Sequence, residues 1–181
     1  MKNSFIILLL ITLMVSCATP EARRPKQHGT TNFYKEVLAK NKRLNALEKK
    51  AIESWIKKDT LYEFKPSTSG FWYAYQKKDT VNVKTPKPEE VTVIDFDITD
   101  LYGNVIYPKQ QKEYTVDKQD FISGLQDGIK LMKKGETITF VIPSYRAYGV
   151  VGDGNKIKGN QPIKSTITLI DIKSKTINEN N

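Results

Sequence analysis

Tyrosine is the residue type in this sequence that stands out as a candidate for chemistry. The stretch PSYRAYG (Pro143 to Gly149) follows TITFVI, whose alternating threonine and apolar residues are typical of a half-buried strand. Turns rarely place aromatic side chains in solvent, and loop residues beyond a strand end often carry function. We therefore expect the side chain of Tyr145 or Tyr148 to point at a specific partner rather than into solvent.

Other kinds of catalytic site are excluded by the residue inventory. The chain has one histidine, His28, and one cysteine, Cys17, so it cannot build a histidine-based metal site or a serine–histidine triad. The segment GDGN (Gly152 to Asn155) lacks the spaced acids and closing glutamate of a calcium loop, and we interpret it as a turn. We expect no metal and no cofactor. The remaining candidates are apolar or aromatic: Phe96, Phe121, Ile122, Leu125 and Tyr148.

Each of these candidates taken alone could equally be a core residue, because branched and aromatic side chains fill protein cores by default. That alternative is weakest for Tyr148, which stands in a loop that ends at Gly149.

The elements that must position these residues indicate one α+β domain. Apolar residues four apart, Phe121, Leu125 and Ile129, predict a helix over Lys118–Glu136 that is ended by Gly135. Several antiparallel strands and one helix, without a βαβ series, predict a sheet with the helix on one face. Strands are expected at Phe71–Gln76, Val91–Asp100, Val105–Pro108, Glu113–Asp117, Thr137–Pro143 and Ser165–Lys173.

The first residues of the chain have the pattern of a bacterial export signal. Lys2 precedes an apolar run of 11 residues, Phe5 to Val15, and small residues follow. As a helix this run would be about 16 Å long, too short to span a bilayer. The stretch MVSC (Met14 to Cys17) resembles a lipobox, which implies a lipid on Cys17 and a location in the bacterial envelope. Ala18 favours the outer membrane, facing the periplasm. The alternative is a plain secreted protein.

A basic amphipathic helix is predicted next, over Asn32–Lys58, with Asn32 as its cap. Its stripe of Leu44, Leu47, Ala51 and Trp55 needs a partner, which could be the main domain, a second copy or another protein. The 11 Lys or Arg and 3 Glu between Ala22 and Lys58 give this segment +8 of the chain's net +9. The charge suits either an anionic membrane surface or a solvated face. An exported chain does not meet nucleic acid, so that partner is excluded.

From about Lys65 to Lys173 the sequence resembles the FKBP-type peptidyl-prolyl isomerases. The resemblance includes SGFWYAY, VTVIDFDITDLYGNVIY and QPIKSTITLIDI, and its most specific block is DFISGLQDGIKLMKKGETITFVIPSYRAYG. It implies a twisted antiparallel sheet wrapped on one short helix. Together with the lipobox and the basic helix, the chain is similar to the gliding-motility-associated isomerase lipoproteins of gliding bacteria.

The resemblance also implies roles for individual residues. Tyr148 matches the tyrosine whose hydroxyl points at the substrate carbonyl, and the Ile122 backbone N–H would donate to the bound peptide. The catalytic set is therefore Tyr148, Phe96, Ile122 and Leu125, with Leu125 on the pocket floor and Phe96 on a wall. The substrate-binding set is Phe121, Ile106, Tyr107 and Leu169.

The sequence departs from the family pattern on the pocket wall. Tyr107 stands where the family often has an aspartate, and Phe96 where it usually has a tyrosine. Because both members of a bonded polar pair are replaced, we expect an intact apolar pocket that is poorer in polar groups.

The leading hypothesis is an envelope-anchored prolyl isomerase that helps exported proteins fold, with gliding as the process that the narrower resemblance implies. The first alternative is a peptide-binding or scaffold module without turnover, and the second is a chaperone that acts through the helix stripe. The oligomeric state stays open. The expected layout is signal peptide 1–16, lipid-anchored tether 17–31, basic helix 32–60, isomerase domain 65–173 and tail 174–181.

Overall fold

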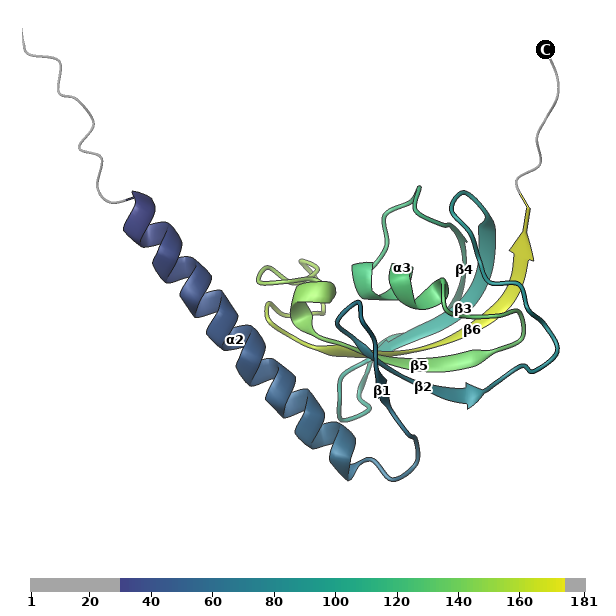
Figure 1. The fold of residues 1–181 in the computed structure, drawn as a ribbon, viewed down its shortest axis with the longest axis horizontal. Helices are drawn as coiled ribbons and strands as arrows, with labels where there is room; N and C mark the ends of the chain where they lie inside the picture. Colours follow the sequence, from purple (N-terminus) through teal and green to yellow (C-terminus); the bar gives the residue numbers. More distant parts are fainter. Residues whose placement is uncertain (1–29, 175–181) are drawn as a thin grey trace, which may run out of the picture. The chain divides into compact units, whose positions relative to one another are not determined.

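The structure is a computed structural model that describes residues 30–174. The proposed signal peptide, Cys17, His28, most of the tether and nearly all of the tail lie outside these residues. No helix in the described part is both long and apolar enough to cross a bilayer. The elements, shown in Figure 1, are α2 (Thr30–Lys58), β1 (Lys65–Pro66), β2 (Trp72–Lys77), β3 (Val91–Thr99), β4 (Val105–Thr115), α3 (Ser123–Ile129), β5 (Thr137–Ile142), the 3₁₀ helix η1 (Ser144–Arg146) and β6 (Ile163–Lys173).

The six strands form one antiparallel sheet in the order β1-β2-β5-β6-β3-β4. Strands β5 and β6 are central, and β3 lies beside β6. Alternate side chains of β3 and β6 fill the core, where Ile94, Ile167 and Leu169 are fully buried. The α+β prediction is confirmed, including the antiparallel sheet and the helix before it. The chain divides into two compact units after Leu38, and the sheet belongs to the unit of residues 39–181.

Helix α3 lies over one face of the sheet (Figure 1). It packs there through two glycines that are one turn apart. A Cβ on Gly124 would lie 2.6 Å from Ile142 Cγ2, and a Cβ on Gly128 would lie 2.6 Å from Phe140 Cε1. Both distances are too short for real side chains, so only glycine lets the helix approach strand β5 this closely. The helix is therefore held close to β5, and this contact also fixes where the first residues of α3 lie.

The predicted helix over Lys118–Glu136 is wrong in extent, because α3 has only 7 residues. It ends at Ile129, well before Gly135, and the chain continues in tight turns in which the Leu131 and Met132 N–H groups donate to the carbonyls three residues earlier. These turns keep Met132 in the core, and Phe121 packs there before the helix begins. The apolar spacing thus extends beyond the helix.

Strand β4 is one continuous strand of 11 residues, where the sequence predicted two short ones. The residues between Pro108 and Glu113 are polar and mostly exposed, which removed the alternation on which the prediction depended. They are held instead by pairing with β3, in which Phe96 is opposite Gln110 and Ile94 is opposite Lys112. This pairing brings polar side chains of β4 next to Phe96.

The C-terminal half of α2 packs on the other face of the sheet. Successive strand residues point to opposite faces, so Phe140 meets α3 while Val141 forms a second buried cluster with Ile52 and Trp72. The main domain is therefore a partner of the helix stripe, with burial centred on Ile52 rather than on Leu47, which is 54% exposed. The helix begins at Thr30, so Asn32 lies inside the first turn and is not its cap.

Candidate active site

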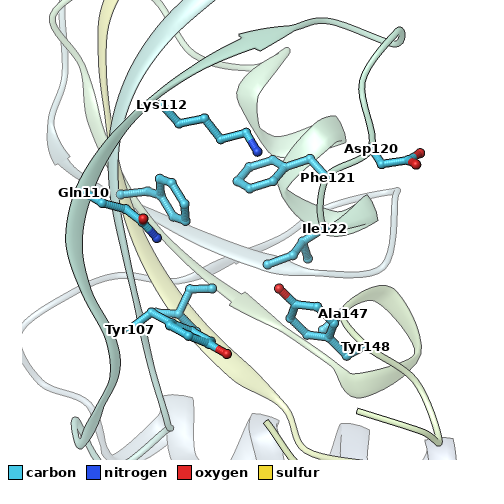
Figure 2. Close-up of a pocket in the computed structure, with 10 residues that line it drawn as sticks. Tyr107, Gln110, Lys112, Asp120, Phe121, Ile122, Ala147 and Tyr148 are labelled. Atoms are coloured by element: carbon cyan, nitrogen blue, oxygen red, sulfur yellow. The ribbon is translucent and has the colours of Figure 1, made fainter. Parts of the chain in front are cut away.

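A cavity of about 500 Å³ opens between the β3–β4 pair, the start of α3 and the loop after η1. This size suits a small ligand or a short peptide segment. Figure 2 shows the side chains around it. The lining residues are Phe96, Ile98, Tyr107, Gln110, Lys112, Asp120, Phe121, Ile122, Ala147 and Tyr148.

Aromatic side chains form the inner wall of the cavity. The Phe121 ring meets the edge of Phe96 with 5.3 Å between ring centroids, and lies 5.5 Å from the ring of the fully buried Tyr114. Contacts between aromatic rings add stabilisation beyond that of burial, and so help to fix the positions of these rings. The Lys112 ammonium lies over the Phe121 ring at 5.0 Å. The wall is therefore an ordered apolar surface with one cation beside it.

Tyr148 presents a hydrogen-bond donor to this apolar space. Its side chain is half-buried, and Figure 2 shows its hydroxyl directed into the cavity on the side of Ile122. Among residues 30–174 the hydroxyl has no hydrogen-bond partner. Burial, and then the nearby Asp153 and Tyr107, raise the pKa of Tyr148 above its ordinary value of 10.0. The phenol therefore keeps its proton at neutral pH, and its O–H group can donate a hydrogen bond to a ligand.

Ile122 provides a second donor on the cavity wall. Its carbonyl accepts the Leu125 and Gln126 N–H groups at 2.8 and 2.9 Å, and these are the first hydrogen bonds of helix α3. Its own backbone N–H has no acceptor within the described chain. An unpaired N–H at a helix start is satisfied by a ligand or water when the site is filled. The cavity thus offers two donors, one from a side chain and one from the backbone.

Tyr107 is bonded to the loop that closes one side of the cavity. Its hydroxyl donates to the Asp153 carboxylate, which also accepts the N–H groups of Asn155 and Ile157 at 2.9 and 2.8 Å. This bond raises the pKa of Tyr107 and lowers that of Asp153. GDGN is therefore a turn organised by Asp153, and Tyr107 ties it to strand β4.

Five of the eight residues predicted for the site line the cavity: Phe96, Tyr107, Phe121, Ile122 and Tyr148. The structure does not place the other three there. Leu125 and Leu169 are fully buried in the core beneath the wall, and Ile106 is partly buried against that core.

Five lining residues were not predicted: Ile98, Gln110, Lys112, Asp120 and Ala147. Ile98 is two residues from Phe96 and on the same strand face, a signal that was available in the sequence. Gln110 and Lys112 reach the site through the pairing of β4 with β3, which the sequence did not indicate. With Asp120 they make the rim more polar than expected.

Comparison with known proteins agrees with this geometry. Residues 73–170 match the family model of FKBP-type peptidyl-prolyl cis-trans isomerases. That match covers more than half of the chain. The chain belongs to this family. The match confirms the resemblance seen in the sequence and places the Tyr148 loop, the start of α3 and the β3–β4 wall within the family's domain.

The relatives are distant. The chain is 25% identical over 140 residues to a probable FKBP-type isomerase FkpA of Neisseria meningitidis serogroup B, which covers 76% of this chain and 51% of that protein. It therefore spans about half the length of this curated relative. The structure resembles FkpA of Escherichia coli (TM-score 0.59, 20% identity, 96% of this chain and 82% of that one). It also resembles an isomerase of Pseudomonas syringae (TM-score 0.58, 21% identity, 72% and 96%). These likenesses establish an FKBP-like fold.

Proposed function

We propose that this protein catalyses cis–trans isomerisation of peptide bonds that precede proline. The observation that carries the proposal is the pair of free donors, the Tyr148 hydroxyl and the Ile122 N–H, beside the aromatic and aliphatic inner wall of the cavity. No acid, base or nucleophile is required for this reaction, because no bond is broken.

The chemistry follows from the nature of the barrier. Rotation about a peptide bond is opposed by about 18–20 kcal/mol of amide resonance, and the planar form is the more charge-separated one. A dry apolar cavity weakens that form relative to the twisted one. A carbonyl that accepts from Tyr148 and a neighbouring one that accepts from Ile122 would be held in the twisted geometry. Lowering the barrier by about 5 kcal/mol gives nearly four decades in rate.

The test is the refolding of a model protein whose slow phase is limited by one prolyl bond. We expect micromolar amounts of the chain to accelerate that phase, and a protease-coupled peptide assay to show turnover. Tight peptide binding without acceleration would instead select the non-catalytic peptide-binding or scaffold module. Neither acceleration nor peptide binding would reject the cavity as a prolyl site.

We propose further that the protein works in the bacterial envelope on exported, proline-containing polypeptides. The support is the export signal with Cys17 at its end, which indicates a lipid anchor and, with Ala18 after it, the outer membrane. The basic segment after the anchor would lie close to anionic head groups and add electrostatic attraction. A role in gliding follows only from the similarity to gliding-associated lipoproteins, and loss of gliding on gene deletion is its test.

A further inference from the structure

The segment that carries Tyr148 is anchored by three consecutive residues to three different elements. Ser144 bonds to Glu48 of α2, the Tyr145 hydroxyl donates to the Gly70 carbonyl at 3.3 Å, and Arg146 pairs with Asp127 of α3. Tyr145 is 47% exposed and lies outside the cavity, where its hydrogen bond holds the segment in place. Of the two tyrosines in this segment, Tyr148 is the one that lines the cavity.

The bonds from Glu48 to Ser144 join residues 96 positions apart. One carboxylate oxygen accepts the Ser144 N–H at 2.5 Å, and the other accepts the Ser144 hydroxyl at 2.7 Å. Ser144 is the first residue of η1 and is only 3% exposed, so water has little access to these donors. A carboxylate that accepts a buried N–H at a helix start makes a strong, charge-assisted bond.

Ser144 in turn closes the turn that holds Tyr148. Its carbonyl accepts the Ala147 N–H at 2.9 Å and the Gly149 N–H at 2.7 Å, on either side of the tyrosine. Any displacement of Ser144 is therefore passed to the backbone of Tyr148. The position of the helix does not itself depend on Glu48, because Ile52, one turn further along the same face, is fully buried against Trp72 and Val141.

We propose that Glu48 is a positioning residue for the site: helix α2 sets the place of the Tyr148 hydroxyl through the Glu48–Ser144 bonds. The N-terminal helix is then part of the framework of the active site. This inference rests on the proposed isomerase function for its kinetic consequence, but not for its structural one.

The experiment compares Glu48→Ala, Glu48→Gln and Glu53→Ala in the full chain. Glu53→Ala is the matched control, because it removes the same charge from the same helix. Within residues 30–174 Glu53 pairs only with Lys49, at 3.9 Å on the surface. We expect E48A to lower kcat about 2- to 10-fold, no more than loss of the Tyr148 hydroxyl itself, with a smaller change in KM, as misplacement of a catalytic group does. E48Q keeps an acceptor for the Ser144 N–H and should recover most of the loss, while E53A should match wild type.

A double-variant comparison separates positioning from general loosening. In the background of Tyr148→Phe, E48A should cause little further loss, because the donor that it positions is already gone. A full additional loss in that background would show that Glu48 acts by another route and would overturn the proposal. Equal kcat for E48A and wild type would overturn it as well.

A spectroscopic readout keeps the proposal testable apart from activity. With ring-labelled tyrosine, the NMR signal of Tyr148 is assigned by its absence in Tyr148→Phe. We expect E48A, but not E53A, to shift that signal, and an unmoved signal would refute the positioning role whatever the kinetics. A shifted signal in a chain with no isomerase activity would support positioning and reject the proposed function.

Discussion

At the scale of single residues, the site depends on a neutral donor, the half-buried phenol of Tyr148, beside an apolar wall. The phenol of Tyr148 faces a cavity lined by Phe96, Phe121 and Ile98, where a hydrogen bond is stronger than in water. Because the hydroxyl has no partner in the described chain, a ligand carbonyl can accept from it without breaking a bond within the protein. Tyr107 is the contrasting case, since its hydroxyl is already committed to Asp153.

The first prediction concerns Tyr148→Phe. Removing the hydroxyl deletes one donor without changing the shape of the wall, so kcat/KM should fall about 10-fold while the thermal midpoint stays within a few degrees. Tyr102→Phe is the control: it removes a phenol hydroxyl from a side chain that is 88% exposed and does not line the cavity. Equal losses in the two variants, measured by the peptide assay, would remove the special role of Tyr148.

The second prediction concerns pH. The pKa of Tyr148 is raised by burial and by its neighbours, and the proton must be present for the hydroxyl to donate. The donor is therefore fully present below its ordinary pKa of 10.0 and is lost only as pH rises through the higher value. We expect kcat/KM to be level from about pH 6 to about pH 9. A bell-shaped profile within that range would point to an acid or base in the mechanism.

At the scale of elements, the sequence was informative wherever a repeating pattern had a single cause. The alternation in Val91–Thr99 placed β3 correctly, because alternate side chains of that strand are buried. The alternation of threonine and apolar residues in Thr137–Ile142 placed β5 correctly as well, although both of its faces are buried, one against α3 and the other against α2. Tyr148 could be singled out because an aromatic residue in a loop beyond a strand end is more often functional than part of the core. Ile122 and Phe121 followed from the family resemblance rather than from any pattern.

The failures came from arrangements that no local pattern encodes. Strand β4 is held by pairing with β3 and not by its own alternation, so Gln110 and Lys112 were missed. The length of α3 was overestimated because turns continued its apolar spacing. The Glu48–Ser144 bonds join positions far apart in the chain, and the surface glutamates of α2 looked alike in sequence.

The third prediction tests how α3 is seated. The nearest atoms to a Cβ on Gly128 all belong to the buried Phe140 ring, so Gly128→Ala should lower the free energy of unfolding by about 1–3 kcal/mol despite the better helix propensity of alanine. Adding Phe140→Leu should make the two changes less than additive, because the smaller side chain relieves the clash. Denaturant unfolding measures both. Strict additivity would mean that the glycine is not needed for close approach.

At the scale of the whole molecule, the two ends of helix α2 have different surroundings. Its C-terminal half is docked on the isomerase domain by Ile52 and Glu48. Its first turns belong to a separate unit and carry exposed apolar side chains. The C-terminal half of α2 would thus hold the site in place, while its N-terminal end is the one that follows the proposed anchor in the sequence.

The fourth prediction tests that anchor. If Cys17 carries lipid, Cys17→Ala should abolish incorporation of labelled fatty acid and move the protein from the membrane fraction to the soluble envelope fraction. A soluble Cys17→Ala protein should keep its isomerase activity, because the cavity lies in residues 96–148. Wild-type protein that takes up no label and is recovered soluble would support a plain secreted form instead.

The last prediction concerns the exposed apolar residues at the start of α2. Phe33, Tyr34 and Leu38 are 67%, 69% and 57% exposed, and clustered apolar surface of this kind binds other apolar surface. If this group, rather than the stripe of Leu44 to Trp55, binds unfolded chains, replacing all three residues by serine should reduce suppression of the aggregation of an unfolded client. Isomerase activity should be unchanged, because these residues lie outside the unit that contains the cavity.

The control for that change is the triple serine replacement of Leu61, Val81 and Val83, which are at least as exposed but lie outside the helix. It removes a similar amount of apolar surface, so it separates a helix-specific effect from a general gain in solubility. If both triple variants lose suppression equally, the effect belongs to total apolar surface. If neither does, the start of α2 does not bind unfolded chains, and its apolar residues must serve contacts of another kind.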